Sequence, residues 1–190
     1  MKISDRQLQS LLTARSTQAL KSLLAQRNLV PSLAQASKLQ KHINTFQQVR
    51  KPVRLGIVHT YTSELLDPWL HFSAALNQLS LDIYHAPYGV TLQEATTNSD
   101  LAEHSPDITL LLLTREDLHP ALQMPPACIN LADKPGINQQ WQQALNRLIS
   151  RFRDTIAGHI IVTLLPSPAA PGMGLYDGMA ENSETHWWNQ

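Results

Sequence analysis

A short apolar segment near residue 55 is the feature that most constrains the fold of this chain. Residues 53–62 read V-R-L-G-I-V-H-T-Y-T, and a helix-type pattern begins immediately afterwards. Apolar, β-branched residues that give way to small hydroxyl residues are typical of a parallel strand leading into a crossover helix. Ligands of open α/β sheets bind outside the carboxyl ends of the strands. The sequence therefore places His59, Thr60, Tyr61 and Thr62 where a binding site is expected.

Three more strands are predicted, at about residues 81–85, 108–113 and 159–165. The run I-T-L-L-L-L at 108–113 is uninterrupted, as in a central parallel strand covered on both faces. Helical spacing of apolar residues predicts crossover helices over about 63–79 and 138–156, and Gly158 is expected to cap the second. The chain is thus predicted to be α/β, with a parallel sheet of four or five strands and flanking helices in a flavodoxin-like three-layer arrangement.

A helical hairpin is predicted ahead of the first strand, over residues 1–50. Ser4 and Gln7 have capping-box spacing, and apolar residues then recur at helical spacing to Leu24. Pro31 and Ser32 open the second helix. Two alternatives stay open: the hairpin packs on the α/β domain (residues 51–190), or it packs on a partner. A last short helix is expected over 182–190.

The composition excludes several classes of function. Fifteen Lys and Arg balance fifteen Asp and Glu, so no overall attraction to nucleic acid or to anionic membrane is expected. Arg50, Lys51 and Arg54 alone are too few to predict a basic patch. The single cysteine, Cys128, excludes an internal disulfide, and no segment has the length of a membrane span or the pattern of a signal peptide. A cytoplasmic protein is expected, and its oligomeric state is left open.

Polar residues follow each early strand, and in a parallel sheet these strand ends meet at one edge. Thr60, Tyr61 and Thr62 follow the first strand, Tyr88 and Gly89 the second, and Glu116 and Asp117 the third. These seven are the candidate ligand-binding residues, and Thr60 and His59 are the candidate catalytic ones. No metal site is expected, because metal-ligand spacing is lacking among His42, His71, His104, His119 and Cys128.

Each candidate also has a structural interpretation. His59 can be a base or a hydrogen-bonded structural residue, and the threonines can hold a ligand or cap a helix. Gly89 is expected to have a positive φ or a close backbone approach. Glu116 and Asp117 can bind a ligand, cap a helix or pair with a cation.

The placement of these blocks resembles the SGNH (GDSL-type) hydrolase fold. That resemblance implies a nucleophile block at Thr60–Thr62, an oxyanion glycine at Gly89 and a further block at residues 114–117. The expected serine is missing, Glu116 stands where an amide donor is usual, and no D-x-x-H block follows. A hydroxyl without a base is a weak nucleophile. The hydrolytic machinery is therefore incomplete, and catalysis is left undecided.

A longer resemblance rests on three phrases: V-R-L-G-I-V-H-T-Y-T-S-E-L-L, L-D-I-Y-H-A-P-Y-G-V-T-L-Q-E and P-D-I-T-L-L-L-L-T-R-E-D-L. These resemble the N-terminal, SGNH-like region of FkbH-like proteins, which also contain a haloacid-dehalogenase-type domain. That family is associated with loading a glyceryl or similar unit onto an acyl carrier protein in polyketide pathways. No D-x-D-x-T motif occurs here, so magnesium would belong to that absent domain and no cofactor is expected in this chain.

Two functions follow as expectations. In the first, the chain is a non-catalytic module, truncated at its C-terminus, that binds acyl carrier protein, its acyl or glyceryl cargo, or the phosphatase-type domain. In the second, it is a degenerate esterase or acyltransferase that uses Thr60 or His59.

Overall fold

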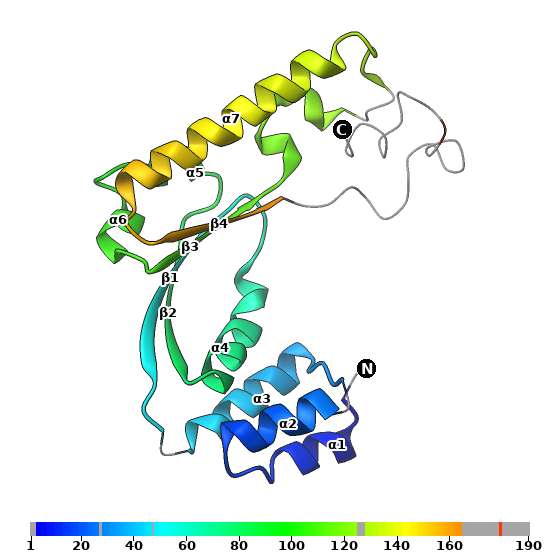
Figure 1. Ribbon diagram of the computed structural model, residues 1–190, viewed down its shortest axis with the longest axis vertical. Helices are drawn as coiled ribbons and strands as arrows, with labels where there is room; N and C mark the ends of the chain where they lie inside the picture. Colours follow the sequence, from blue (N-terminus) through cyan, green and yellow to red (C-terminus); the bar gives the residue numbers. More distant parts are fainter. Residues whose placement is uncertain (1–2, 27, 47, 125–127, 165–178, 180–190) are drawn as a thin grey trace. The chain divides into compact units, whose positions relative to one another are not determined.

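The computed structural model describes residues 3–26, 28–46, 48–124, 128–164 and 179. The chain divides into two compact units. Unit 1 comprises residues 1–55 and 62–84, and unit 2 comprises residues 56–61 and 85–190. Figure 1 shows the elements of both units. Each unit has a hydrophobic core of its own.

Four parallel strands form the sheet: β1 (Lys51–His59), β2 (Leu79–His85), β3 (Ile108–Leu113) and β4 (His159–Leu164). They are ordered β2-β1-β3-β4 (Figure 1). β3 pairs with β4 from Ile108 opposite His159 to Leu113 opposite Leu164. The predicted three-layer α/β fold with a parallel sheet is therefore confirmed.

The strand order determines where a ligand can bind. The chain places β2 on one side of β1 and β3 on the other, so the order reverses between β1 and β3. A crevice forms at such a reversal, outside the carboxyl ends of the two strands. The residues that follow His59 and Leu113 therefore lie at the predicted position of a site.

Unit 1 begins with three helices: α1 (Asp5–Leu11), α2 (Thr17–Gln26) and α3 (Leu33–Asn44). The expected capping boxes form at Ser4 and Ser32. The prediction of a two-helix hairpin is wrong, because the expected first helix divides into α1 and α2. The Thr13 hydroxyl donates to the Ser10 carbonyl, and the Ser16 hydroxyl accepts from the Ala19 amide. Such local bonds compete with a continuous helix.

α2 and α3 pack against α4 (Asp67–Leu76), which follows a short 3₁₀ turn, Glu64–Leu66, and α1 packs on α2. Phe72 and Ala75 of α4 are buried in the same core as Leu20, Leu39 and Ile43. The Trp69 indole N–H of α4 donates to the Pro31 carbonyl at 2.9 Å. Of the two alternatives for these helices, packing within the same chain is therefore observed.

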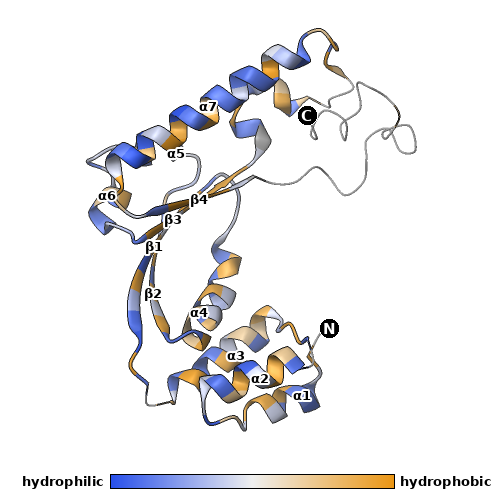
Figure 2. Cartoon of the chain, in the orientation of Figure 1, coloured by the Kyte–Doolittle hydropathy of each residue, from blue (hydrophilic) through white to orange (hydrophobic). Residues whose placement is uncertain are grey.

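Unit 2 contains α5 (Thr91–Glu94), α6 (Asp100–His104), the 3₁₀ turns η2 (Arg115–Asp117) and η3 (Pro120–Gln123), and α7 (Lys134–Thr155). α7 is amphipathic, with hydrophobic and hydrophilic residues alternating along it (Figure 2). Its apolar stripe buries Leu148 and Phe152. No helix in the described ranges is both long and apolar enough to cross a bilayer.

Two predictions about the ends of α7 differ from the structure. The helix begins at Lys134 rather than near residue 138, because Pro135 occupies its first turn, where a missing N–H costs nothing. Gly158 does not cap it, since the helix ends at Thr155 with Ile156 as its C-cap. The helix expected over 182–190 lies outside the described residues.

Candidate functional site

The carboxylate of Asp117 joins the ends of β1 and β3. Its Oδ2 accepts hydrogen bonds from the Thr60 hydroxyl at 2.5 Å, the Thr114 amide at 2.7 Å and the Thr114 hydroxyl at 2.7 Å. Thr60 follows β1 directly, and Thr114 follows β3. One acidic oxygen therefore fixes both strand ends at the point where the strand order reverses.

A cavity of about 440 Å³ opens beside this network, entirely within unit 2. Its walls come from the strand ends, from α5, from the turn after β3 and from the buried face of α7. The lining residues are Thr60, Tyr88, Gly89, Thr91, Leu92, Gln93, Leu113, Asp117, Leu118, Ala144 and Leu148. The volume is within the range of small-molecule sites.

The lining combines an apolar wall with polar groups near the strand ends. Leu92, Leu113, Leu118 and Leu148 supply aliphatic surface, and neither lysine, arginine nor histidine is among the residues that line the cavity. The Asp117 carboxylate accepts hydrogen bonds but cannot donate them when ionised. These walls suit a small ligand that is partly apolar and carries hydrogen-bond donors.

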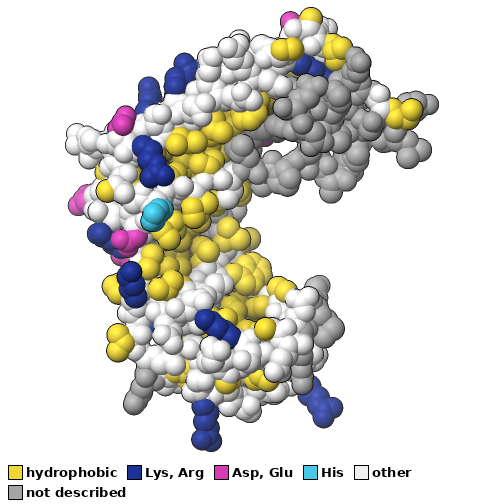
Figure 3. Space-filling view, in the orientation of Figure 1, with side chains coloured by type: hydrophobic (Ala, Val, Ile, Leu, Met, Phe, Trp, Pro, Cys, Tyr) yellow, Lys and Arg dark blue, Asp and Glu magenta, His cyan; other side chains and the backbone are white. Residues whose placement is uncertain are grey.

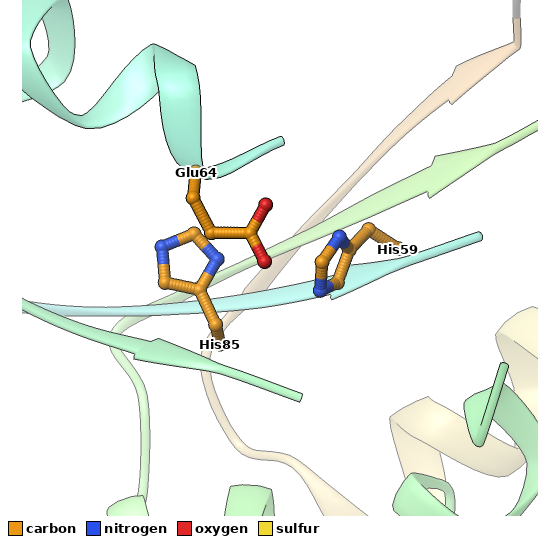
Figure 4. A group of neighbouring side chains, drawn as sticks. All are labelled: His59, Glu64 and His85. Atoms are coloured by element: carbon orange, nitrogen blue, oxygen red, sulfur yellow. The ribbon is translucent and has the colours of Figure 1, made fainter. Parts of the chain in front are cut away.

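His59 is 3 % exposed and lies at the end of β1. Its Nδ1 is 2.7 Å from the Tyr61 carbonyl oxygen, and its Nε2 is 2.9 Å from the Ala86 carbonyl oxygen. The His59 ring contacts the ring of His85, with the two centroids 5.7 Å apart (Figure 4). It also contacts the ring of Tyr88. Both ring nitrogens therefore face carbonyl oxygens, which connects the end of β1 to the segment after β2.

This arrangement favours the structural interpretation of His59. A general base or a metal ligand needs a nitrogen lone pair directed at the proton or the ion. At His59 both nitrogens are directed at backbone acceptors. We therefore describe His59 as a structural link between the end of β1 and the segment after β2.

Gly89 has the positive φ that was expected, +76°, and apart from its chain neighbours no described residue lies within 4 Å of the position that a Cβ would occupy. Its role is therefore conformational, since it lets the chain turn from β2 into α5 beside the cavity. The space around it would accept a methyl group, whereas the backbone angle would not.

Gly89→Ala is expected to lower the free energy of unfolding by about 1–2 kcal/mol, the cost of a left-handed residue with a side chain. The measurement is urea denaturation followed by circular dichroism. Gly89→Asn is the matched control, because asparagine tolerates this angle better, and it should lose less. Equal losses in the two variants would contradict a conformational role.

Four of the predicted site residues line the cavity: Thr60, Tyr88, Gly89 and Asp117. Three do not: Tyr61, Thr62 and Glu116. The Tyr61 carbonyl contacts His59 instead, and Glu116 is half-buried. The helix-capping alternative for the threonines does not hold, because Ser63 is the N-cap of the first turn after β1.

The walls supplied by α5 and α7 were not predicted as part of the site. Thr91, Leu92 and Gln93 come from α5, and Ala144 and Leu148 come from α7. Ala144 and Leu148 are four residues apart on the apolar stripe of α7, so the stripe was visible in the sequence. The sequence does not show which part of this stripe faces the cavity and which part faces the packed core, because that depends on how α7 lies on the sheet.

The contacts of the Thr60 hydroxyl bear on the hydrolase alternative. The hydroxyl donates to Asp117 and lies 3.5 Å from the Leu112 carbonyl oxygen, with no imidazole in hydrogen-bond contact among the described residues. The Thr114 amide also donates to Asp117, at 2.7 Å. Thr60, Thr114 and Asp117 thus form a hydrogen-bond network at the strand ends.

No family model and no curated protein matches the chain. A solved structure is similar: the N-terminal part of the protein BF1531 from Bacteroides fragilis, which contains a phosphatase domain and was crystallised with Mg. The identity is 12 % and the TM-score 0.58, over 84 % of this chain. This chain spans only 40 % of the length of that structure. The similarity shows a related fold.

Proposed function

We propose that this chain is a non-catalytic SGNH-like module of an FkbH-like system, and that its cavity holds the acyl group of a loaded acyl carrier protein. The observation that carries the proposal is the cavity at the strand ends, in which the one carboxylate among the described lining residues already has three hydrogen bonds on one oxygen. A site built in this way can hold a small molecule without acting on it.

The chemistry of the walls supports a short hydroxylated acyl group as the ligand. Asp117 Oδ2 is used by Thr60 and Thr114, and the second oxygen of the carboxylate can accept from a ligand hydroxyl. The buried Thr91 hydroxyl has no hydrogen-bond partner among the described residues. A buried hydroxyl without a partner costs free energy, which a bound polar group would recover. The leucine walls would cover the carbon chain.

The related fold supports the wider setting of the proposal. The similar structure contains a phosphatase domain, and the sequence phrases resemble a family that combines such a domain with an SGNH-like region. Binding to a separate phosphatase-type domain is therefore the other form of the same hypothesis. In both forms the chain positions a partner or its cargo and leaves the chemistry to another domain.

Titration with a carrier protein loaded with a glyceryl group tests the proposal, with the unloaded carrier as reference. The loaded form should bind at least about tenfold more tightly, a difference of about 1.4 kcal/mol, because only it fills the cavity. Ala144→Phe should remove this difference by filling the cavity, whereas Ala157→Phe, at an exposed position, should not. Equal affinity for both carriers would contradict cargo binding.

The second candidate is an esterase or acyltransferase, favoured by the short hydrogen bond from the Thr60 hydroxyl to a carboxylate. In that case short p-nitrophenyl esters should be hydrolysed, and Thr60→Ala should abolish the activity. We expect no turnover above background. Turnover that is lost in Thr60→Ala would replace the binding module with an enzyme.

A further inference from the structure

The overall charge of zero conceals a strong division between the two units. Unit 1 carries ten Lys and Arg against four Asp and Glu, a formal charge of +6, and unit 2 carries five against eleven, a formal charge of −6. Even if every carboxylate of unit 1 were paired with a cation, six cations would have no carboxylate partner in their own unit. Unit 1 is therefore strongly basic.

The four acidic residues of unit 1 are also unevenly placed. Asp5 begins α1, Glu64 and Asp67 lie at the start of the α4 region, and Asp82 lies in β2. The sequences of α2 and α3 contain no acidic residue. The basic charge is therefore concentrated on the N-terminal helices, from which Lys and Arg side chains project in Figure 3.

Five cations lie in α3 or in segments next to its C-terminal end, and we call them the α3 basic face: Arg15, Lys38, Lys41, Arg50 and Lys51. Lys38 and Lys41 are exposed and three residues apart on the helix, so they share one face. The Arg50 guanidinium donates to the Ile43 carbonyl and to the Asn44 side chain, which places it at the C-terminal end of α3.

Arg15 is tied to the same end of α3, and Lys51 follows Arg50 directly. The residue before Arg15, Ala14, has its carbonyl oxygen 2.8 Å from Nε2 of His42. Arg15 and Lys51 are both exposed.

Apolar surface beside these cations favours a protein partner over a nucleic acid. Val49, directly before Arg50, is 96 % exposed. Protein interfaces combine an apolar centre with charged surroundings. Single-stranded nucleic acids are bound by stacking on aromatic side chains, but Trp69 of this unit is partly buried and bonded to Pro31.

We propose that the α3 basic face docks an acidic carrier protein through that protein's own surface, independently of the cargo. The identity of the partner rests on the proposed function, whereas the charge and the place of the surface do not. Docking by complementary charge chiefly raises the rate of association and depends on salt. The unloaded carrier should therefore bind weakly at low salt and less tightly as salt is added.

The test measures binding of an unloaded, acidic acyl carrier protein to the full chain at 50 and 300 mM salt. Lys38→Glu/Lys41→Glu should weaken binding at 50 mM by about tenfold or more, because both charges are reversed at the contact. The control Arg147→Glu/Arg151→Glu makes the same change in total charge on exposed positions of α7 and should change binding less than about twofold. Lys38→Gln/Lys41→Gln should give an intermediate loss, and thermal unfolding checks that all variants are folded.

Three results would overturn the inference. The first is unchanged carrier binding in Lys38→Glu/Lys41→Glu, and the second is an equal loss in the α7 control. The third is tighter binding of a 20-nucleotide RNA than of the carrier, lost in the same α3 variant, since the surface would then be a nucleic-acid site. A glyceryl N-acetylcysteamine thioester, which lacks the carrier protein, measures cargo binding separately. If this thioester binds while the carrier does not dock, only the docking surface fails.

Discussion

Replacing Asp117 with alanine is expected to weaken binding of a glyceryl thioester by about tenfold or more and to destabilise unit 2 by about 1–2 kcal/mol. The carboxylate accepts from Thr60 and from both donors of Thr114, and it supplies the charged acceptor of the cavity. Asp117 is exposed, so in the alanine variant water can form some of the hydrogen bonds that the carboxylate made. The expected loss of stability is therefore small for hydrogen bonds to a charged group.

The two effects of Asp117 can be separated with a second variant. Asp117→Asn keeps one acceptor oxygen for the threonines and should lose about half as much stability, while cargo binding still falls. Asp154→Ala, at an exposed position of α7, removes the same charge from the same unit and should change stability by less than about 0.5 kcal/mol. Urea denaturation and calorimetric titration give both quantities. Wild-type affinity in Asp117→Ala would remove this residue from the site.

Gly158→Ala is expected to lower the free energy of unfolding by about 2–3 kcal/mol, the upper range for an overpacked site. A Cβ at this position would lie 2.3 Å from the Pro106 carbonyl oxygen and 2.6 Å from that of Asp107. Both are backbone atoms that precede β3, and the His159 amide donates to the Asp107 carbonyl at 2.9 Å. To relieve this contact, the backbone that pairs β3 with β4 must shift, because no flexible side chain can move out of the way.

Gly136→Ala is the control for Gly158→Ala. Gly136 lies in the first turns of α7 with nothing within 4 Å of the Cβ position, and alanine is the better helix former there by up to about 1 kcal/mol. It should therefore leave stability unchanged or raise it. Thermal and urea unfolding measure both variants. A Gly158→Ala protein as stable as wild type would show that β3 and the segment before β4 are not so closely packed.

The strands were predictable because their signals are local. The apolar run at residues 108–113 coincides with β3, and the run from Val53 marks β1, which begins two residues earlier. Strand alternation with helices was sufficient to predict a parallel sheet. The division of the first helix was missed because it depends on Thr13 and Ser16 hydroxyls that form local bonds, in a segment without proline or glycine.

The candidate site was partly predictable for a similar reason. Residues directly after strands must lie at the carboxyl edge, so Thr60, Gly89 and Asp117 were found from their positions alone. The bond between Thr60 and Asp117 spans 57 positions in the sequence and depends on which strands are neighbours. The charge division was hidden because the total charge sums over both units, and the chain passes from one unit to the other three times.

Methyl NMR of the leucines tests the central claim, that the strand-end cavity binds cargo, most directly. On addition of the glyceryl thioester, we expect the methyl signals of Leu92, Leu113, Leu118 and Leu148 to shift, while those of Leu20 and Leu39 in the core of unit 1 stay in place. The shifts should disappear in Ala144→Phe. No shift at the four cavity leucines at millimolar thioester, or shifts that persist in Ala144→Phe, would contradict the account.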